Sequence, residues 1–401
     1  MSEQRLREEL RDASVPGASE AEERAWLIVA DAWAERAPTP GVRPWLRRRL
    51  AAASAVAVAA LVAAGLVLTP AGAAVREWIG DAIDPGRNDA KPALTRLPAD
   101  GDLLVSSAAG SWIVHRDGSK RLLGEYSQAS WSPHGLYVAV ASGRELAAVD
   151  PKGELRWSIE RHRISDPRWS PNEGYRIAYR SGGELRVIWG DGANDEALAR
   201  SAPVAPAWQP RTGRRNVLAY ATPGGEVRIV DTDTRRRLES GPDLGRPLEL
   251  EWSTDGSRLL VLTAEGLTLL DPAGDVVARD RFGRGTSGVD AEFVPGSTTV
   301  ATIRRSGSSQ IRSEVFLTRF GDRVGERRIF AGSGLFEGLA YSPAGDRLLV
   351  GWRDADQWLF LPADGSGRIE TVGAITGKFA TGESASQAAF PRVEGWCCRG
   401  G

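Results

Sequence analysis

Hydrophobic and polar positions divide the chain into two unlike parts. Leu50–Thr69 is a run of twenty residues without a charge, whereas from about residue 100 onward short apolar runs alternate with turns rich in Gly, Pro and Asp. A helix of about twenty residues spans the roughly 30 Å of a membrane's hydrocarbon core, and short apolar runs between turn residues are typical of strands. The pattern predicts one transmembrane helix followed by an all-β domain.

Charged residues flank the uncharged run unequally. Pro70 opens its C-terminal side, and its N-terminal side carries four arginines, Arg43, Arg47, Arg48 and Arg49. Because basic residues favour the cytoplasmic side, we expect the N-terminus inside and the chain after the span outside. The expected domains are a cytosolic charged helical tail (1–49), the transmembrane helix (50–69), a juxtamembrane linker (70–98) and the β domain (99–398). The alternatives are a signal peptide cleaved near Ala71, with an unusually long N-terminal region, and a buried soluble helix.

The N-terminal tail contains one candidate docking helix. Ser19 and Glu22 form a capping-box pattern, after which Trp26, Leu27 and Trp33 recur near helical spacing on one face. A tail of this length cannot bury such a face in a core of its own. The segment is either a solvated, frayed helix or a docking helix for a cytosolic protein, with Trp26, Leu27 and Trp33 as its candidate partner-binding residues.

The β domain contains a degenerate repeat with an aromatic landmark. An aromatic residue is followed, usually, by Ser-Pro and a turn, as in SWSPHG at Ser130–Gly135 and AYSPAG at Ala340–Gly345. Seven copies recur at spacings of 38 to 49 residues, with their aromatics at Trp131, Trp169, Trp208, Trp252, Phe293, Tyr341 and Phe390. A period of about 40–50 residues is that of a four-stranded propeller blade.

A second landmark predicts how the ring closes. About twenty residues after each of the first six aromatics, a short strand ends in an acidic or Gly turn such as VDPKG, and a further copy, His115–Gly118, precedes the first aromatic. Residues 102–126 therefore supply three strands of one blade, and we expect Gln387–Arg392 to supply the fourth, which removes the exposed sheet edges. Seven landmarks of each kind predict a seven-bladed β-propeller. Six blades is the alternative, because the last copy keeps only Phe390 and its Pro.

The aromatic landmark identifies a type of repeat. SWSPHG, RWSPNEG and AYSPAG, each followed by an apolar strand, resemble the TolB-type, WD-repeat-like β-propeller repeats, also found in prolyl-oligopeptidase-type enzymes. The resemblance covers about Asp100 to Cys398 and implies the fold, whereas propellers host binding platforms, sensors and enzymes alike. The oligopeptidase-type enzymes carry a G-x-S-x-G elbow in a separate hydrolase domain, and the sequence contains no such pentapeptide. We expect that the protein is not an enzyme.

Composition excludes several classes of function. Lys and Arg total 51 against 52 for Asp and Glu, so a net charge of -1 provides no global basic field to hold nucleic acid. Three scattered His and two Cys are too few for a zinc or iron–sulfur site, and we expect no metal, cofactor or catalytic residues. The Asp residues of the second landmark are expected to stabilise their own turns rather than to form a catalytic ring.

The two cysteines, Cys397 and Cys398, are adjacent in sequence. We favour an oxidised pair, although neighbouring Cα atoms are about 3.8 Å apart and ordinary bridges need about 4.4–6.8 Å. The alternatives are an intermolecular bridge, a free thiol pair, or two small buried hydrophobic side chains. No redox activity is assigned.

These features together predict a membrane-anchored binding protein. We expect a single-pass protein of a GC-rich bacterium, whose extracytoplasmic propeller is a sensor or scaffold that binds a protein, peptide or envelope ligand through loops at one mouth. The order of tail, span and outer domain resembles that of transmembrane anti-sigma factors, which implies signalling to a sigma factor, although no His or Cys precedes residue 115 to match their zinc-binding pattern. The alternative is an extracytoplasmic hydrolase or lyase that uses carboxylates at the channel mouth.

Overall fold

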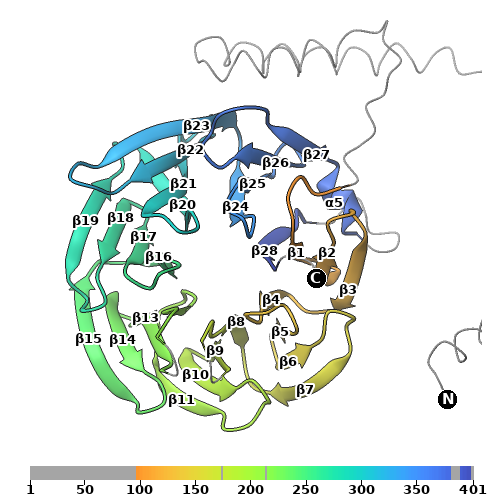
Figure 1. Cartoon of the computed structure of the whole chain (residues 1–401), viewed down its shortest axis with the longest axis vertical. Coiled ribbons are helices and arrows are strands. Elements are labelled where there is room, and N and C mark those ends of the chain that lie inside the picture. Colours follow the sequence, from red (N-terminus) through yellow and green to blue (C-terminus); the bar gives the residue numbers. More distant parts are fainter. Residues whose placement is uncertain (1–95, 173–174, 213–214, 381–388, 399–401) are drawn as a thin grey trace, which may run out of the picture. The chain divides into compact units, whose positions relative to one another are not determined.

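The computed structural model describes residues 96–401 apart from 173–174, 213–214, 381–388 and 399–401. These residues form seven four-stranded antiparallel sheets around a central axis (Figure 1), so the expected seven-bladed β-propeller is confirmed and six blades is wrong. The expected tail, span and Trp26/Leu27/Trp33 face all lie outside the described residues, as does most of the linker. Among the described helices none is long and apolar enough to cross a membrane.

Each blade places its four strands in order from the axis outward (Figure 1). Blade 1 contains β28 (Arg392–Cys397), β1 (Asp102–Ser107), β2 (Gly110–Val114) and β3 (Lys120–Gly124). Blade 2 contains β4 (Gln128–Trp131), β5 (Val138–Ser142), β6 (Glu145–Val149) and β7 (Leu155–Glu160). Blade 3 contains β8 (Ile164–Trp169), β9 (Arg176–Ser181), β10 (Glu184–Trp189) and β11 (Glu196–Arg200). Blade 4 contains β12 (Ala207–Trp208), β13 (Val217–Ala221), β14 (Glu226–Asp231) and β15 (Arg236–Asp243).

The remaining three blades follow the same order. Blade 5 contains β16 (Pro247–Trp252), β17 (Leu259–Thr263), β18 (Gly266–Leu270) and β19 (Val276–Arg281). Blade 6 contains β20 (Thr286–Phe293), β21 (Thr299–Ser306), β22 (Arg312–Arg319) and β23 (Gly325–Ser333). Blade 7 contains β24 (Phe336–Tyr341), β25 (Arg347–Trp352), β26 (Gln357–Pro362) and β27 (Glu370–Gly373), and the short helix α5 (Ile375–Lys378) follows it.

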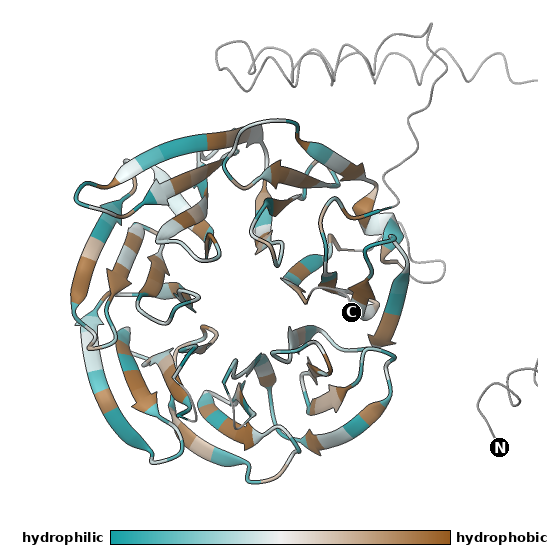
Figure 2. Cartoon of the chain, viewed as in Figure 1, coloured by the Kyte–Doolittle hydropathy of each residue, from teal (hydrophilic) through white to brown (hydrophobic). Residues whose placement is uncertain are grey.

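The core lies between the blades. Middle strands are apolar on both faces because each sheet packs between two neighbours, and Leu259–Leu262 of β17 are wholly buried. Outermost strands such as β7 alternate between exposed and half-buried positions, and Figure 2 shows the mixed polarity of the outer rim. This arrangement explains why the sequence shows continuous apolar runs at the middle strands and alternation at the rim.

The aromatic landmark ends the innermost strand of each blade. Trp252, at the end of β16, is 6% exposed and pairs in register with the first residue of β17, Leu259. The serine that follows closes the turn: the Ser253 side chain accepts a hydrogen bond from the Arg258 N–H (3.0 Å), and the Ser253 carbonyl accepts from the Gly256 N–H (2.8 Å). Gly256 has a φ of 71°, which explains the glycine of the landmark.

The closing strand differs from the expected one. The N-terminal segment does supply three strands of blade 1, but the fourth, β28, begins at Arg392 instead of ending there. Trp396, paired with Leu103, occupies the position that Trp252 occupies in blade 5, so Trp396 and not Phe390 is the seventh landmark. The prediction failed because two cysteines replace the Ser-Pro after Trp396, whereas Phe390 precedes a proline.

Candidate functional site

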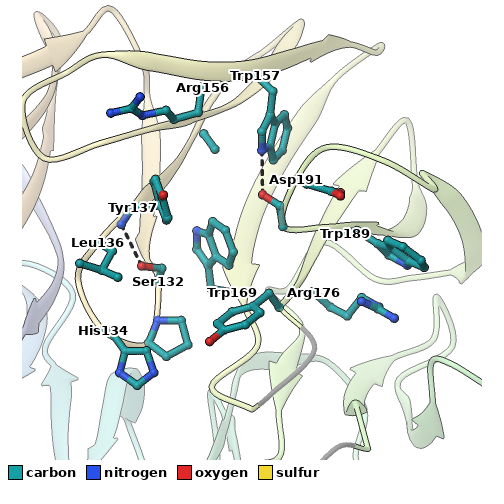
Figure 3. Close-up of a pocket in the computed structure, with 14 residues that line it drawn as sticks. Ser132, His134, Leu136, Tyr137, Arg156, Trp157, Trp169, Arg176, Trp189 and Asp191 are labelled. Carbon is teal, nitrogen blue, oxygen red and sulfur yellow. Dashed lines mark hydrogen bonds between the residues drawn. The ribbon is translucent and has the colours of Figure 1, made fainter.

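A pocket of about 500 Å³ lies between blades 2 and 3, on the side of the ring that carries their first turns (Figure 3). We call it the aromatic pocket, because five aromatic side chains line it: Tyr137, Trp157, Trp169, Tyr175 and Trp189. Its other side chains include Pro133, Leu136, Ala148 and, at polar positions, Ser132, His134, Arg156, Arg176 and Asp191. Its volume is within the range of ordinary ligand pockets, about 300–1,000 Å³.

The first turn of blade 2 exposes large apolar and aromatic side chains where blade 5 has polar ones. Leu136 and Tyr137 follow the turn glycine and are 63% and 41% exposed, whereas Ser257 and Arg258 occupy these positions in blade 5. The Tyr137 N–H donates to the Ser132 hydroxyl oxygen (3.0 Å), the same bond that closes the turn of blade 5. Blade 2 therefore has the same turn geometry as blade 5 but exposes different side chains on it.

Blade 3 contributes a tryptophan at a position of the second landmark. The Gly192 N–H donates to the Trp189 carbonyl (2.9 Å), as the Gly274 N–H donates to the Asp271 carbonyl in blade 5. Trp189 thus replaces a turn-forming aspartate, and its side chain is 42% exposed. An exposed Trp in place of an Asp gains nothing for the turn, which makes Trp189 a candidate binding residue.

Contacts within the pocket fix three of the rings. The Trp157 indole N–H donates to the Gly190 carbonyl (2.7 Å), which ties β7 of blade 2 to blade 3 (Figure 3). The Arg176 guanidinium lies 4.6 Å from the centre of the Trp189 ring and also pairs with Asp233 at 2.9 Å. Trp169 is only 8% exposed and lies between the two blades. These three rings are therefore held in place before any ligand binds.

The arginines at the rim of the aromatic pocket are already paired. Arg156 lies 2.7 Å from Asp150 and 3.3 Å from Glu154. Hydrogen bonds from the Glu154 backbone and from Arg156 lower the pKa of Asp150. The exposed Asp191 carboxylate accepts the Ala193 N–H of its own turn at 3.0 Å. The pocket therefore presents aromatic rings, with Asp191 as an exposed acid at its rim.

A second cluster of polar side chains lies on the innermost strands of blades 5 and 6. Its four members, which we call the acidic arc, are Glu249, Glu251, Asp290 and Glu292. Glu251 accepts the Phe293 N–H of the next blade at 2.8 Å, and Glu292 accepts the Tyr341 N–H of the blade after it at 3.1 Å. Glu249 and Asp290 accept the Ala291 and Leu339 N–H groups in the same way, at 2.9 and 3.2 Å. The arc therefore joins three consecutive blades.

Burial and mutual repulsion keep part of the acidic arc protonated. Burial raises the pKa of Asp290 to about 6 and that of Glu292 to about 8. Burial, together with the neighbouring carboxylates, also raises the pKa of Glu249 and of Glu251 well above its usual value. No group of three or more His, Cys, Asp or Glu in the described ranges is placed to hold a metal ion.

The other residues singled out from the sequence have structural positions. Cys397 and Cys398 are joined by a disulfide at the end of β28. A side chain at Gly135 would lie 2.7 Å from the Cys398 sulfur, so the disulfide packs against the first turn of blade 2. The landmark aspartates serve their turns as expected: Asp271 accepts the Ala273 and Asp275 N–H groups, both at 2.9 Å.

Sequence reasoning missed both the aromatic pocket and the acidic arc. The pocket has a signal in the sequence: when the copies are aligned on their turns, blades 2 and 3 have Leu136, Tyr137 and Trp189 where blade 5 has the polar residues at 257, 258 and 271. The arc has a weaker one, an acid at the first and third positions before the aromatic in two consecutive blades. Neither signal shows which side chains of neighbouring blades lie together, so the two sites could be located only in the structure.

Comparisons with known proteins give distant structural similarities and no family. Neither a family model nor a curated protein matches the chain. Hydrazine synthase of Kuenenia stuttgartiensis is a similar solved structure, with 17% identity over 60% of this chain and 77% of that one, and a TM-score of 0.49. Another is the β-propeller domain of Cps50 (Swd1) from Myceliophteria thermophila, with 12% identity over 62% of this chain and 86% of that one, and a TM-score of 0.49. The seven-bladed assignment rests on the sheet pairing itself.

Proposed function

We propose that the propeller is a binding module whose aromatic pocket accepts a peptide segment of a protein partner. One observation carries this proposal: blades 2 and 3 replace polar turn residues by Leu136, Tyr137 and Trp189, and these exposed side chains surround one pocket. Tyr and Trp dominate the energetics of protein interfaces, and full burial of one such large side chain contributes about 1.5–3 kcal/mol. Because Trp157, Trp169 and Trp189 are held by contacts within the fold, they lose little side-chain entropy when a ligand binds.

We also propose that this module is anchored in a membrane. The uncharged run at 50–69 and the arginines before it support an anchor with the propeller outside the cytoplasm. In this proposal the TolB-like propeller is the sensor, and Trp26, Leu27 and Trp33 contact a cytosolic partner such as a sigma factor. The resemblance to anti-sigma architecture supports that last step.

The acidic arc favours a second candidate, a hydrolase or lyase. A carboxyl group with a pKa of about 8, as at Glu292, stays protonated at neutral pH and is suited to general acid catalysis. All four carboxylates nevertheless accept backbone N–H groups of neighbouring strands, which is a structural task. The aromatic pocket belongs to blades 2 and 3 and the arc to blades 5 and 6, so binding in the pocket does not bring a substrate to the arc.

Peptide display tests the binding function. The full-length protein is immobilised and used to select peptides from a random library, and selected peptides are measured against Tyr137→Ala and Trp189→Ala. We expect each substitution to weaken binding about tenfold, because an interface tryptophan or tyrosine contributes more than 1 kcal/mol. Val277→Ala is the matched control, since Val277 is 45% exposed on β19 of blade 5. Selected peptides that bind both pocket variants as they bind the control would rule the proposal out.

A further inference from the structure

Three side chains of the aromatic pocket offer a hydrogen-bond donor to a ligand. The indole N–H of Trp189 can only donate. The hydroxyls of Tyr137 and Tyr175 also have a proton to give, and both side chains are exposed, at 41% and 52%. Within the described part of the chain, neither these hydroxyls nor the Trp189 indole N–H has a hydrogen-bond partner.

Some acceptors in the same pocket are engaged by the protein itself. The Gly190 carbonyl accepts the Trp157 indole N–H, and the Ser132 hydroxyl oxygen accepts the Tyr137 N–H (Figure 3). Asp191 uses one carboxylate oxygen to accept the Ala193 N–H of its own turn, so its other oxygen and the exposed His134 ring remain as acceptors. The donors without a partner nevertheless call for a ligand that brings acceptors together with apolar surface.

We propose that the ligand of the aromatic pocket is a proline-rich, extended segment of a partner protein. Proline supplies a carbonyl acceptor and an apolar ring but has no N–H, so a proline-rich backbone fits a surface of donors and rings. An ordinary extended peptide offers the same carbonyls but lacks the preformed backbone and the apolar rings that suit a groove lined by aromatic side chains. The inference rests on the proposed binding function and deepens it.

The placement of the rings agrees with this ligand. Tyr137 and Trp157 come from blade 2 and Trp189 comes from blade 3, with Trp169 between them, so the rings line both sides of a shared pocket (Figure 3). Polyproline segments have three residues per turn and dock between aromatic side chains in this manner. An amphipathic helix would satisfy its own carbonyls and leave the donors of the pocket unpaired.

The test uses synthetic peptides and variants that remove a donor. A fluorescent decaproline peptide and an Ala-Ser peptide of equal length are titrated into the full-length protein and followed by fluorescence anisotropy. We expect saturable binding of decaproline and none of the Ala-Ser peptide. Tyr137→Phe and Tyr175→Phe keep the rings and should each weaken decaproline binding about three- to tenfold, the loss of one hydrogen bond. Trp189→Phe removes the N–H and part of the ring, so it should weaken binding at least as much. Val277→Ala is the control for an unrelated exposed position.

The outcomes separate the ligand class from the binding function. Decaproline that fails to bind, while display-selected peptides without proline still depend on Trp189, would overturn the proline-rich ligand and leave the binding module intact. Decaproline bound equally well by the three Phe variants would also overturn the ligand class, because the donors would then contribute nothing. If no peptide of either kind depends on the pocket residues, the proposed binding function fails as well.

Discussion

The landmark tryptophans differ in burial, so their substitution by alanine should lower the free energy of unfolding by different amounts. Trp252 is 6% exposed, whereas Trp131 is only half-buried at the corresponding position of blade 2. Trp252→Ala should therefore lower the free energy of unfolding by about 3–5 kcal/mol, through lost burial and an unfilled cavity. Trp131→Ala should cost clearly less, because part of that ring already contacts water. Urea unfolding of the two variants measures both values, and equal losses would contradict the difference in packing.

The acidic arc makes the stability of the ring depend on pH. In the folded protein the pKa of Asp290 is raised from 3.8 to about 6 and that of Glu292 from 4.5 to about 8. A raised folded pKa gives stability that is complete below the unfolded pKa and is lost as the pH rises through the folded one. We therefore expect the melting temperature to fall between about pH 4 and pH 8.

Glu292→Gln provides the matched control for that titration. The glutamine carbonyl still accepts the Tyr341 N–H, but the side chain cannot ionise. The variant should lose the part of the pH dependence that extends toward pH 8. A melting temperature that falls equally steeply in both proteins would show that Glu292 is not the group responsible.

At the scale of single elements, β28 is the strand that closes the ring. Trp396 on β28 is 8% exposed and meets the Phe360 ring edge-on at 5.8 Å, whereas Phe390 precedes the strand and is half-buried. We expect Trp396→Ala to destabilise the protein by about 3–5 kcal/mol. Phe390→Ala should cost less than half of that amount. Chemical unfolding of both variants measures the two losses of stability. A larger loss for Phe390→Ala than for Trp396→Ala would identify Phe390 as the closing landmark.

The elements that could be predicted are those specified by residues close together in the sequence. Trp131, Trp169 and Trp252, each followed by a turn serine, give the blade period and hence the fold without any knowledge of contacts. The closing strand was displaced because Cys397 and Cys398 stand where the other copies have Ser-Pro or a related pair. A repeat can therefore be counted correctly while one of its copies is misaligned.

The site was not predictable because it depends on differences between copies and on contacts between blades. Trp189 is recognisable only when its turn is compared with that of Asp271, and the pocket requires it to lie beside Tyr137 of another blade. The acidic arc likewise joins Glu251 to a backbone N–H that is 42 residues away in the sequence. Composition and periodicity hold no information about such contacts.

At the scale of the whole molecule, the proposed anchor predicts the location of the propeller. The arginines before residue 50 favour the cytoplasmic side, and Pro98 lies beyond the uncharged run. An alkaline phosphatase reporter fused after Pro98 should therefore be active, because that enzyme folds only outside the cytoplasm, where disulfides form. The same reporter fused after Arg36 should be inactive. Activity in the reverse order would invert the topology.

The central claim is that the aromatic pocket of blades 2 and 3 is the ligand site. Installing the polar residues of blade 5 at the equivalent positions tests this claim most directly. Leu136→Ser, Tyr137→Arg and Trp189→Asp, combined in the full-length protein, install the residues found at 257, 258 and 271 of blade 5. Because those residues serve the same turns there, the melting temperature should stay close to that of the native protein. The dissociation constant for display-selected peptides should rise by at least about tenfold. Native affinity in the folded triple variant would contradict the account.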